Sequence, residues 1–445
     1  MNRLSAAEMT ALRKAATASF IGNFIEWFDY ASYAYLATTI SVVFFPNENK
    51  NLALLQTFAV FALSFLIRPI GGMIWGTWGD KYGRRWALSW SILFMSGATF
   101  MIGILPGYAR IGVLAPIMLL LCRLVQGFSA SGEYAGAATF LGEYAPEHKR
   151  GMYTSLVPAS TATGLLIGSL MVAAMNYWLT PGAMEAWAWR VPFLLALPLG
   201  MIGRYIRVHL EDSEVYRQMQ ERIKNLEEQT PVRDLFKFHW REVCIGFGVS
   251  CLNAVGFYML LTYTPTYLKE VLNFDDTQSF LASTITLFVY VFLIFAMGYY
   301  SDHIGRRRAL ITACIGFIVF TVPLFWWLDG ASFVTVVLIE VGLCVLLTLN
   351  DGTLATFLVE LFPSNVRYTG FALSFNAANA LFGGTAPFIA TWLIGATGSK
   401  LAPAIYLIVI AVVALGAMIA SKDRTGRNLE ADIDPEVLQE SSQRS

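Results

Sequence analysis

The chain has 445 residues and a formal net charge of zero, with 56% hydrophobic and only 14% charged residues. A soluble globular protein carries about a quarter charged residues, so this composition excludes that class and predicts a membrane protein. A spanning helix needs roughly 20 mostly apolar residues. Twelve apolar runs satisfy this length, and they lie near 15–44, 52–79, 87–107, 112–142, 152–178, 190–208, 242–268, 278–301, 309–328, 333–359, 369–395 and 402–420.

Basic residues in the loops predict how these runs are oriented, because lysine and arginine are retained on the cytoplasmic side. One set of alternate loops is rich in them: Lys81, Arg84, Arg85, Lys149, Arg150, the basic residues of 207–241, Arg306, Arg307, Arg308 and Arg367. The other set holds only Lys50, Arg110, Arg190, Lys269 and Lys400. Both termini are therefore expected in the cytoplasm. The first run contains two carboxylates and is not expected to be a cleaved signal peptide.

The first run, 15–44, carries these two carboxylates near its middle. Glu26 and Asp29 lie one helical turn apart, and Tyr30 shares a helix face with Glu26. A carboxylate near the bilayer centre is costly unless it faces a cavity or a partner. The pair therefore indicates either a functional site or a buried structural ion pair.

Further charges lie at a similar depth in the second and fourth runs. Arg68, Arg123 and Glu133 are each within roughly 10 Å of the middle of their run, because a helix rises about 1.5 Å per residue. We predict Asp29 and Glu26, and then Glu133, as proton-coupling acids. The two arginines are expected either as their counter-ions or as ligands of a substrate carboxylate.

One charged turn occurs twice and divides the chain into two related halves. The spacing of Gly76–Arg85 returns at Gly298–Arg307, and a second repeat matches Glu143, Pro146 and Arg150 with Glu360, Pro363 and Arg367. In such a turn the aspartate can pair with a helix N-terminus or with the arginine four residues later. Two copies in register favour a gate over a plain basic loop. The expected gating residues are Gly76, Asp80, Gly83, Arg84, Asp302, Gly305 and Arg306.

The repeat predicts an all-α membrane protein with twelve transmembrane helices in two pseudo-symmetric six-helix bundles, an arrangement typical of secondary transporters. The bundles are expected over 1–208 and 241–420. Residues 209–240 are polar with a narrow apolar stripe, which indicates a cytoplasmic linker containing a surface helix. Residues 421–445 are polar without heptads and are predicted to be a disordered cytoplasmic tail.

The second half has fewer membrane charges and more aromatic and amide side chains. Tyr258 and Tyr263 of the seventh run, with Trp27 and Tyr30 of the first, would suit a quaternary ammonium group through cation–π attraction. Packing at the membrane interface is the alternative role for such aromatic residues. The expected substrate-binding residues are Arg68, Arg123, Trp27, Tyr30, Tyr258, Tyr263, Asn253 and Asn376.

Two membrane acids remain in the second half. Glu340 lies toward the outer end of its run, whereas Asp351 is more central. If none of the three acids of the first half couples protons, Asp351 becomes the next candidate.

The sequence contains no phosphate-binding loop, no nucleophile–base arrangement and no metal-binding spacing of cysteines or histidines. We therefore expect no enzyme activity, no cofactor, no metal and no nucleic-acid partner. The expected partners are a small organic solute, protons and the lipid bilayer.

These residues resemble a known family. The paired turns, with Arg123, Gln126 and Gly127, are similar to motifs of the major facilitator superfamily. Residues 22–30, 65–72, 126–134 and 189–193 resemble its metabolite:proton symporters, whose members carry proline, betaines, 2-oxoglutarate, citrate or shikimate. Residues 258–268 look most like the proline/betaine branch, although the best-known type of that branch ends in a long coiled coil that 421–445 lacks. The resemblance implies a rocker-type transporter in a bacterial inner membrane.

Together these features predict a proton-coupled symporter that imports a small zwitterionic or carboxylate solute by alternating access. Proline or a betaine is the first expectation, and 2-oxoglutarate, citrate or shikimate the second. A drug/proton antiporter is an alternative, but the fifth run lacks the Gly-Pro pair typical of such antiporters. A transporter-like nutrient receptor is another, which would carry extended cytoplasmic signalling domains.

Overall fold

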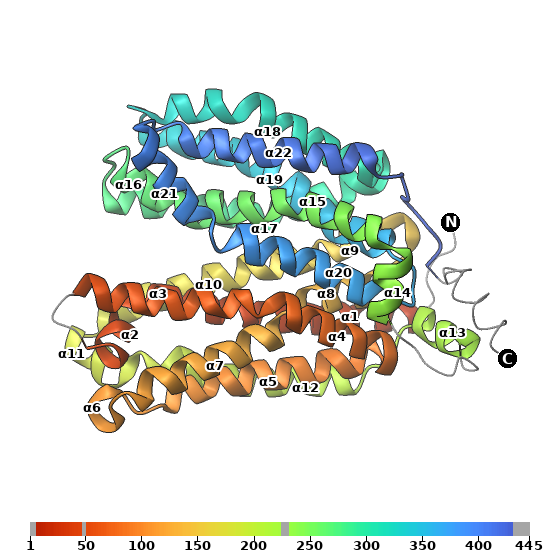
Figure 1. Ribbon diagram of the computed structural model, residues 1–445, viewed down its shortest axis with the longest axis horizontal. Coiled ribbons are helices and arrows are strands. Elements are labelled where there is room, and N and C mark those ends of the chain that lie inside the picture. The colour runs from red at the N-terminus through yellow and green to blue at the C-terminus, as the bar shows by residue number, and fades with distance from the viewer. Residues whose placement is uncertain (1–5, 47–49, 224–230, 430–445) are drawn as a thin grey trace.

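The computed structural model describes residues 6–46, 50–223 and 231–429, and every regular element within these ranges is a helix. The helices form two groups that lie side by side, α1–α12 in one and α15–α22 in the other (Figure 1). The predicted all-α architecture of two six-helix bundles is therefore confirmed.

The first group holds six spans, several of which are broken into shorter helices. Its elements are α1 (Ala6–Tyr35), α2 (Ala37–Phe44), α3 (Lys50–Leu66), α4 (Arg68–Tyr82), α5 (Arg84–Ile104), α6 (Tyr108–Ile111), α7 (Leu114–Ala130), α8 (Glu133–Tyr144), η1 (Glu147–Lys149), α9 (Arg150–Thr154), α10 (Leu156–Trp178), α11 (Pro181–Ala183), the π-helical η2 (Met184–Ala188) and α12 (Arg190–Val208).

Two short helices, α13 (Glu214–Ile223) and α14 (Pro231–Phe238), lie between the groups in sequence. The second group comprises α15 (Trp240–Phe257), η3 (Tyr258–Tyr263), α16 (Thr264–Glu270), α17 (Asp276–Ile304), α18 (Arg306–Leu328), α19 (Phe333–Leu361), α20 (Arg367–Ala378), η4 (Asn379–Gly383), α21 (Ala386–Thr397) and α22 (Ala402–Ala420). Eleven stretches of the described chain are long and apolar enough to cross a membrane, and α1, with its 30 residues, supplies the twelfth span.

Two spans of the second group are interrupted by π-helical turns, η3 and η4. At η3 the following Pro265 has no N–H to donate, and the Thr264 hydroxyl donates instead to the carbonyl of Met259 at 2.9 Å. Such turns are frequent at functional sites. The apolar runs of the sequence do not reveal them, because a π turn changes the hydrogen bonding and leaves the composition unchanged.

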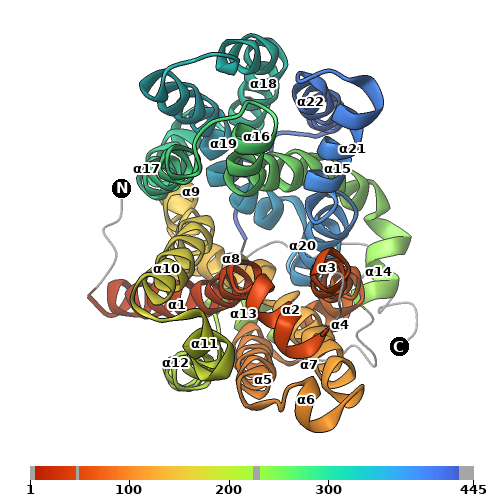
Figure 2. The same ribbon diagram turned by 90° about the vertical axis from the view of Figure 1, so that its left-hand side faces the viewer.

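The segment 421–429 lies at the same end of the molecule as α13 and α14 (right in Figure 1), and we call this end the termini side. Figure 2 looks onto the opposite side, where α2, α6, α11 and α16 face the viewer. Between the groups, α4 packs against α20, and α9 and α10 pack against α17.

Residues 421–429 lie against the termini side of the second group, unlike the disordered tail expected from 421 onward. Arg424 donates to the carbonyl of Leu361 and to Glu242 at 3.0 Å, and Leu429 is buried. The segment is ordered because its few arginine, threonine and leucine side chains reach helix ends that need partners. Residues 430–445 of the expected tail lie outside the described residues.

Candidate transport site

Glu26 of α1 is paired with an arginine that a break in the second span brings to its depth. Nη2 of Arg68 donates to Glu26 at 2.8 Å, and both side chains are buried. Arg68 begins α4 directly after the break at Ile67. Pro69 suits this position, because a first-turn residue needs no N–H donor.

Asp29 forms a second pair, with Arg123 of α7 at 3.1 Å. Gln126, one turn further along α7, donates to the same Asp29 oxygen and, at 2.8 Å, to Thr99 of α5. Arg123 in turn donates to Gln126 at 2.5 Å. The sequence analysis assigned Gln126 only to a family motif, but its amide is part of the site.

Aromatic rings join the two pairs and continue into the second group. The guanidinium carbon of Arg68 lies 4.8 Å from the ring centroid of Tyr30, and that of Arg123 lies 5.1 Å from it. The ring of Trp27 lies 6.3 Å from that of Tyr258 in η3. The cluster therefore spans the boundary between the two helix groups.

Several buried polar atoms of this cluster have no hydrogen-bond partner within the described chain. They are the indole N–H of Trp27, the hydroxyls of Tyr30 and Tyr258, Nε of Arg68, Nε and Nη2 of Arg123, and one carboxylate oxygen each of Glu26 and Asp29. Buried polar atoms in folded proteins are nearly always paired. The cluster therefore has hydrogen-bonding groups that the described chain leaves unused.

Three predicted substrate residues use their polar groups elsewhere. The Tyr263 hydroxyl accepts from Thr391 at 3.1 Å, and Asn253 donates to Asp351 at 2.7 Å. Asn376 donates to the backbone carbonyl of Ser131 at 2.8 Å, where α20 meets the first group. The structure thus gives these residues structural partners without bringing their amide or hydroxyl groups into the cluster.

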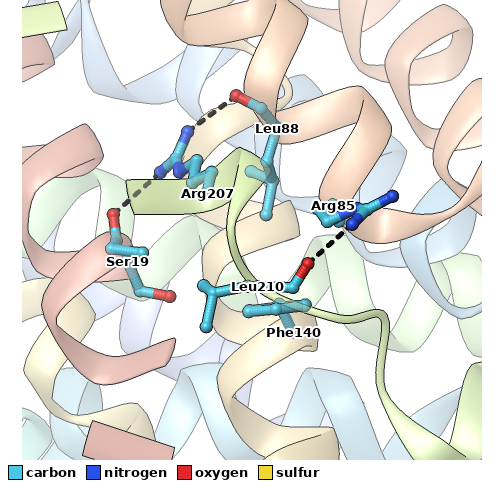
Figure 3. A pocket seen from close by; sticks show the side chains of 7 residues that line it. Ser19, Arg85, Leu88, Phe140, Arg207 and Leu210 are labelled. Atoms are coloured by element: carbon cyan, nitrogen blue, oxygen red, sulfur yellow. Dashed lines mark hydrogen bonds between the residues drawn. The ribbon is translucent and has the colours of Figure 1, made fainter. Parts of the chain in front are cut away.

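Glu133 pairs with a different arginine from those of the other two predicted coupling acids. Both terminal nitrogens of Arg207 donate to it, and Arg207 donates further to the carbonyls of Leu88 and Ala18. Figure 3 shows Arg207 reaching the carbonyl of Leu88 beside a small pocket that Leu210 also lines. Arg207 was expected to be a loop residue, so its pairing with Glu133, 74 positions away in the sequence, was not predicted.

The first copy of the repeated turn binds the start of α20. Asp80 accepts from the backbone N–H of Tyr368 at 3.3 Å and of Thr369 at 3.0 Å, and from the Thr369 hydroxyl at 2.7 Å. Arg84 lies 2.9 Å from the same carboxylate. Both pairings that the sequence suggested for this aspartate, a helix N-terminus and the following arginine, occur together.

The second copy does the same to the start of α9. Asp302 accepts from the backbone N–H of Gly151 at 2.8 Å and of Met152 at 3.0 Å. Arg306 lies 2.6 Å from Asp302. Each turn therefore caps a helix of the opposite group, and a negative charge at a helix N-terminus is stabilising.

The repeated glutamates link the arginines into two matched networks. Glu143 lies 3.3 Å from Arg84 and 2.9 Å from Arg367. Glu360 lies 3.4 Å from Arg306 and 2.7 Å from Arg150. We call these the α20 network and the α9 network, after the helix that each caps.

The motif glycines permit this geometry in two ways. A Cβ atom on Gly76 would lie 2.5 Å from the backbone of Thr369, and one on Gly298 would lie 2.6 Å from the carbonyl of Gly151. Side chains there would force the two groups apart. Gly83 and Gly305 have φ values of 109° and 93°, a region that glycine adopts without penalty.

A segment behind each network caps the helix that follows the turn. Asp212 accepts from the backbone N–H of Arg85 at 2.9 Å, and Thr425 accepts from that of Arg306 at 2.8 Å. Burial raises the pKa of Asp212 above its ordinary value. We call residues 209–223 the linker clasp and residues 421–429 the tail clasp.

Comparison with known proteins agrees with this architecture. Residues 20–387 match the family model of the Major Facilitator Superfamily. The proton:xylose symporter XylE bound to 6-bromo-6-deoxy-D-glucose superposes with a TM-score of 0.76 at 17% identity, over 95% of this chain and 98% of that one. A partially occluded inward open structure of XylE from E. coli gives 0.66 at 16% identity, over 92% and 97%.

Closer relatives are found by sequence. The chain is 36% identical to the glycine betaine/proline/ectoine/pipecolic acid transporter OusA of Dickeya dadantii, over 94% of this chain and 85% of that protein. It is 35% identical to the proline/betaine transporter of Salmonella typhimurium, with the same shares covered, and 38% identical to a putative proline/betaine transporter of Staphylococcus aureus, over 90% and 86%. These matches confirm the predicted likeness to proline/betaine transporters, and they confirm a transporter and not an enzyme. The chain belongs to the major facilitator superfamily.

Proposed function

We propose that the chain is a proton-coupled symporter that imports a small zwitterion of the proline or betaine type by alternating access. The observation that carries the proposal is the buried cluster of aromatic rings and two arginine–carboxylate pairs between the helix groups, with its unpartnered polar atoms. The printed names of the relatives support the class of solute.

A zwitterion matches both chemistries of the cluster. Its carboxylate suits the free nitrogens of Arg68 and Arg123, because guanidinium groups bind carboxylates through paired hydrogen bonds. Its ammonium group suits the faces of Trp27 and Tyr258, since ring faces attract cations. Among the described side chains these two rings have no cation–π contact with arginine or lysine, whereas Tyr30 has two.

Coupling follows from competition for an arginine. A solute carboxylate that binds Arg68 displaces Glu26, and the freed Glu26 would be a buried charge without a partner. Such a group is too costly to keep and binds a proton instead. Asp29 and Arg123 offer the same exchange one turn along α1. Glu133 is less suited to this role, because Arg207 holds both of its oxygens.

The two networks on the termini side support alternating access. The basic loops lie on this side, which we therefore infer to face the cytoplasm, with the protein in a bacterial inner membrane. To open on that side, Asp80 must leave the start of α20 and Asp302 must leave the start of α9. The two groups, 1–208 and 241–420, would then rock about the central cluster, as repeated halves do in secondary transporters.

The test is counterflow in proteoliposomes with labelled proline, glycine betaine, 2-oxoglutarate, citrate and shikimate. We expect proline or glycine betaine to exchange, and uptake to rise with an inward proton gradient and collapse with a protonophore. Uptake that survives the protonophore and depends on a sodium gradient would contradict proton coupling. Export of cationic drugs, or solute binding without flux, would favour an antiporter or a receptor.

A further inference from the structure

α19 buries one central carboxyl that has only neutral hydrogen-bond donors around it. Oδ1 of Asp351 accepts from Asn253 of α15 at 2.7 Å and from Asn350 at 3.1 Å. Oδ2 accepts from the hydroxyl of Tyr290 in α17 at 2.6 Å. The side chain is fully buried, and within the described residues no arginine, lysine or histidine pairs with it.

This environment sets Asp351 apart from most buried acids of the molecule. Seven other carboxylates in or at the ends of the spans each pair with an arginine: Glu26, Asp29, Asp80, Glu133, Glu143, Asp302 and Glu360. The other exception in the described chain is Glu340, whose Oε2 accepts from Thr286 at 2.7 Å. A buried carboxylate without a cationic partner stays charged only while hydrogen-bond donors solvate it, and it binds a proton when they are lost.

Asp351 also lies where the two helix groups meet. Its helix α19 packs against α8, α9 and α10 of the first group. Titratable groups of the described chain that interact with Asp351 include Tyr290 of α17, Tyr134 of α8 and Cys344 of α19 itself. Tyr134 belongs to the first group, and its ring stacks on Phe375 of α20 with centroids 4.3 Å apart. A rearrangement between the groups would therefore be felt at this carboxyl.

A second connection runs to the candidate solute site. Asn253 lies on α15, which continues directly into η3 with Tyr258. The ring of Phe257 contacts that of Trp27 at 5.2 Å and that of Tyr290 at 6.2 Å. A shift of this helix when solute binds would move a donor of Asp351 and, through Phe257, the ring of the second donor.

We propose that Asp351 is a proton-binding carboxyl of the second half, which takes up a proton in one state of the transport cycle and releases it in the other. With Asn253 and Tyr290 in place the charged form is solvated by three donors. When the helix carrying Asn253 moves, the carboxyl loses a donor, has no arginine to turn to, and binds a proton from the side then open. The inference rests on the proposed proton symport and adds a site that the first-half pairs do not supply.

The first experiment compares Asp351→Asn with the wild type in proteoliposomes. Accumulation of proline or glycine betaine by the wild-type protein under a proton gradient establishes the proposed function. If the wild type accumulates none of the five solutes, the proposed function is overturned. Given a coupled wild type, we expect Asp351→Asn to lose accumulation at least tenfold while keeping counterflow exchange within about threefold. Accumulation close to wild type in this variant overturns the inference.

Glu340→Gln is the matched control, because it removes a second unpaired acid from the same helix. Glu340 lies 11 residues nearer the start of α19, about 16 Å along its axis. We expect it to keep at least half of the accumulation. An equal loss in both variants would show a general effect of removing a buried acid from α19 and would overturn the assignment to Asp351.

An infrared difference spectrum between acid and alkaline pH tests the site without any solute. We expect a protonated-carboxyl band that Asp351→Asn removes and Glu340→Gln leaves in place. If Asp351→Asn does not fold, Tyr290→Phe provides the test, because loss of the donated hydrogen bond must move this band. If neither Asp351→Asn nor Tyr290→Phe changes this band, the inference is overturned, whatever the transported solute.

Discussion

At the scale of single residues, burial decides what each charge of the site can do. Removing one partner of a buried ion pair typically costs about 3–5 kcal/mol, because the other charge stays behind unpaired. An exposed pair such as Arg217–Glu211 contributes about 0–1 kcal/mol. Amide substitutions of Glu26 and Asp29 keep an acceptor for their arginines and are therefore the better probes of coupling.

We expect Glu26→Gln and Asp29→Asn both to retain solute exchange. At least one of the two variants should lose uphill accumulation. Exchange needs no net proton movement, whereas accumulation requires a group that binds and releases a proton. The measurement is counterflow beside gradient-driven uptake, with Glu133→Gln as the comparison. If all three variants concentrate solute normally, the coupling acid lies outside α1 and α8.

Arg68→Lys is expected to raise the KM for proline or glycine betaine about tenfold, the equivalent of one charge-assisted hydrogen bond of about 1.5 kcal/mol. A lysine keeps the charge but loses the planar fork that pairs with a carboxylate. Arg190→Lys is the control, because Arg190 donates to the carbonyls of Gly103 and Leu105 and stacks on the ring of Trp189, and none of these residues belongs to the aromatic and arginine cluster. Equal KM values in the two variants would exclude Arg68 as a solute ligand.

The sequence located the acids and arginines of the site but not all of their partners. Depth along an apolar run follows from counting residues, so Glu26, Asp29, Arg68 and Arg123 could be placed near the centre. Pairing depends on how helices rotate against each other, and no periodicity reports that rotation. Arg207 shows the difference, because its run ends at the membrane boundary while its side chain turns inward to Glu133.

At the scale of elements, the repeated turn is a cross-bundle helix cap. Each copy places a carboxylate at the N-terminus of a helix from the other half and locks it with an arginine four residues on. The sequence predicted these local pairings, since the spacing is contained in one turn. It could not predict that α20 and α9 would be the helices capped, because that contact joins residues more than a hundred positions apart.

Asp80→Asn and Asp302→Asn are each expected to change the rate of net uptake while leaving equilibrium solute binding within about threefold. The amide keeps an acceptor but loses the charge that attracts both the arginine and the helix N-terminus. Stopped-flow uptake and equilibrium binding on the same preparation measure the two quantities. Loss of binding in correctly folded protein would place these residues in the solute site instead.

Asp212 provides a pH-dependent test of the cap on α5. Its pKa is raised by burial, so the charged form is disfavoured in the folded protein, and its cost to stability appears as pH rises past the ordinary value of 3.8. Asp212→Asn keeps an acceptor for the N–H of Arg85. We therefore expect its thermal midpoint to exceed that of the wild type at neutral pH and to match it near pH 3.8.

Asp212→Ala supplies the opposite arm of this test. It removes the cap altogether and should destabilise the protein at both pH values by about 0.5–2 kcal/mol, the usual worth of an N-cap. A destabilisation by Asp212→Asn equal to that of Asp212→Ala would mean that the charge, and not the acceptor, holds α5.

At the scale of the whole molecule, the two halves differ in their interior charges but are joined by matched ion-pair networks, the α20 and α9 networks. Near the middle of the spans, the first half holds the arginine-paired Glu26 and Asp29, whereas the second holds Asp351 with neutral donors. Twelve spans and twofold repetition were predictable because composition and motif spacing survive in the sequence. The interruption of spans by η3 and η4, and the order of residues 421–429, were not, since both depend on single hydrogen bonds at helix ends.

We expect the two halves to assemble when they are expressed as separate chains cut between residues 223 and 231. Each half then keeps its own clasp, and the hydrogen bonds by which the α20 and α9 networks join the two halves remain available for assembly. Co-purification of a tagged first half with the second, and uptake by cells that express both, are the measurements. A cut after residue 208 is the matched control and should assemble less well, because it separates Asp212 from α5.

The linker clasp and the tail clasp occupy equivalent places in the two halves of the chain. Asp212 follows the end of α12 at Val208 by four residues, and Thr425 follows the end of α22 at Ala420 by five. Both accept a hydrogen bond from a backbone N–H at the start of the third span of their own half, α5 in the first and α18 in the second. The correspondence between the halves therefore extends past the sixth span of each, and the linker occupies the place in the first half that residues 421–429 occupy in the second.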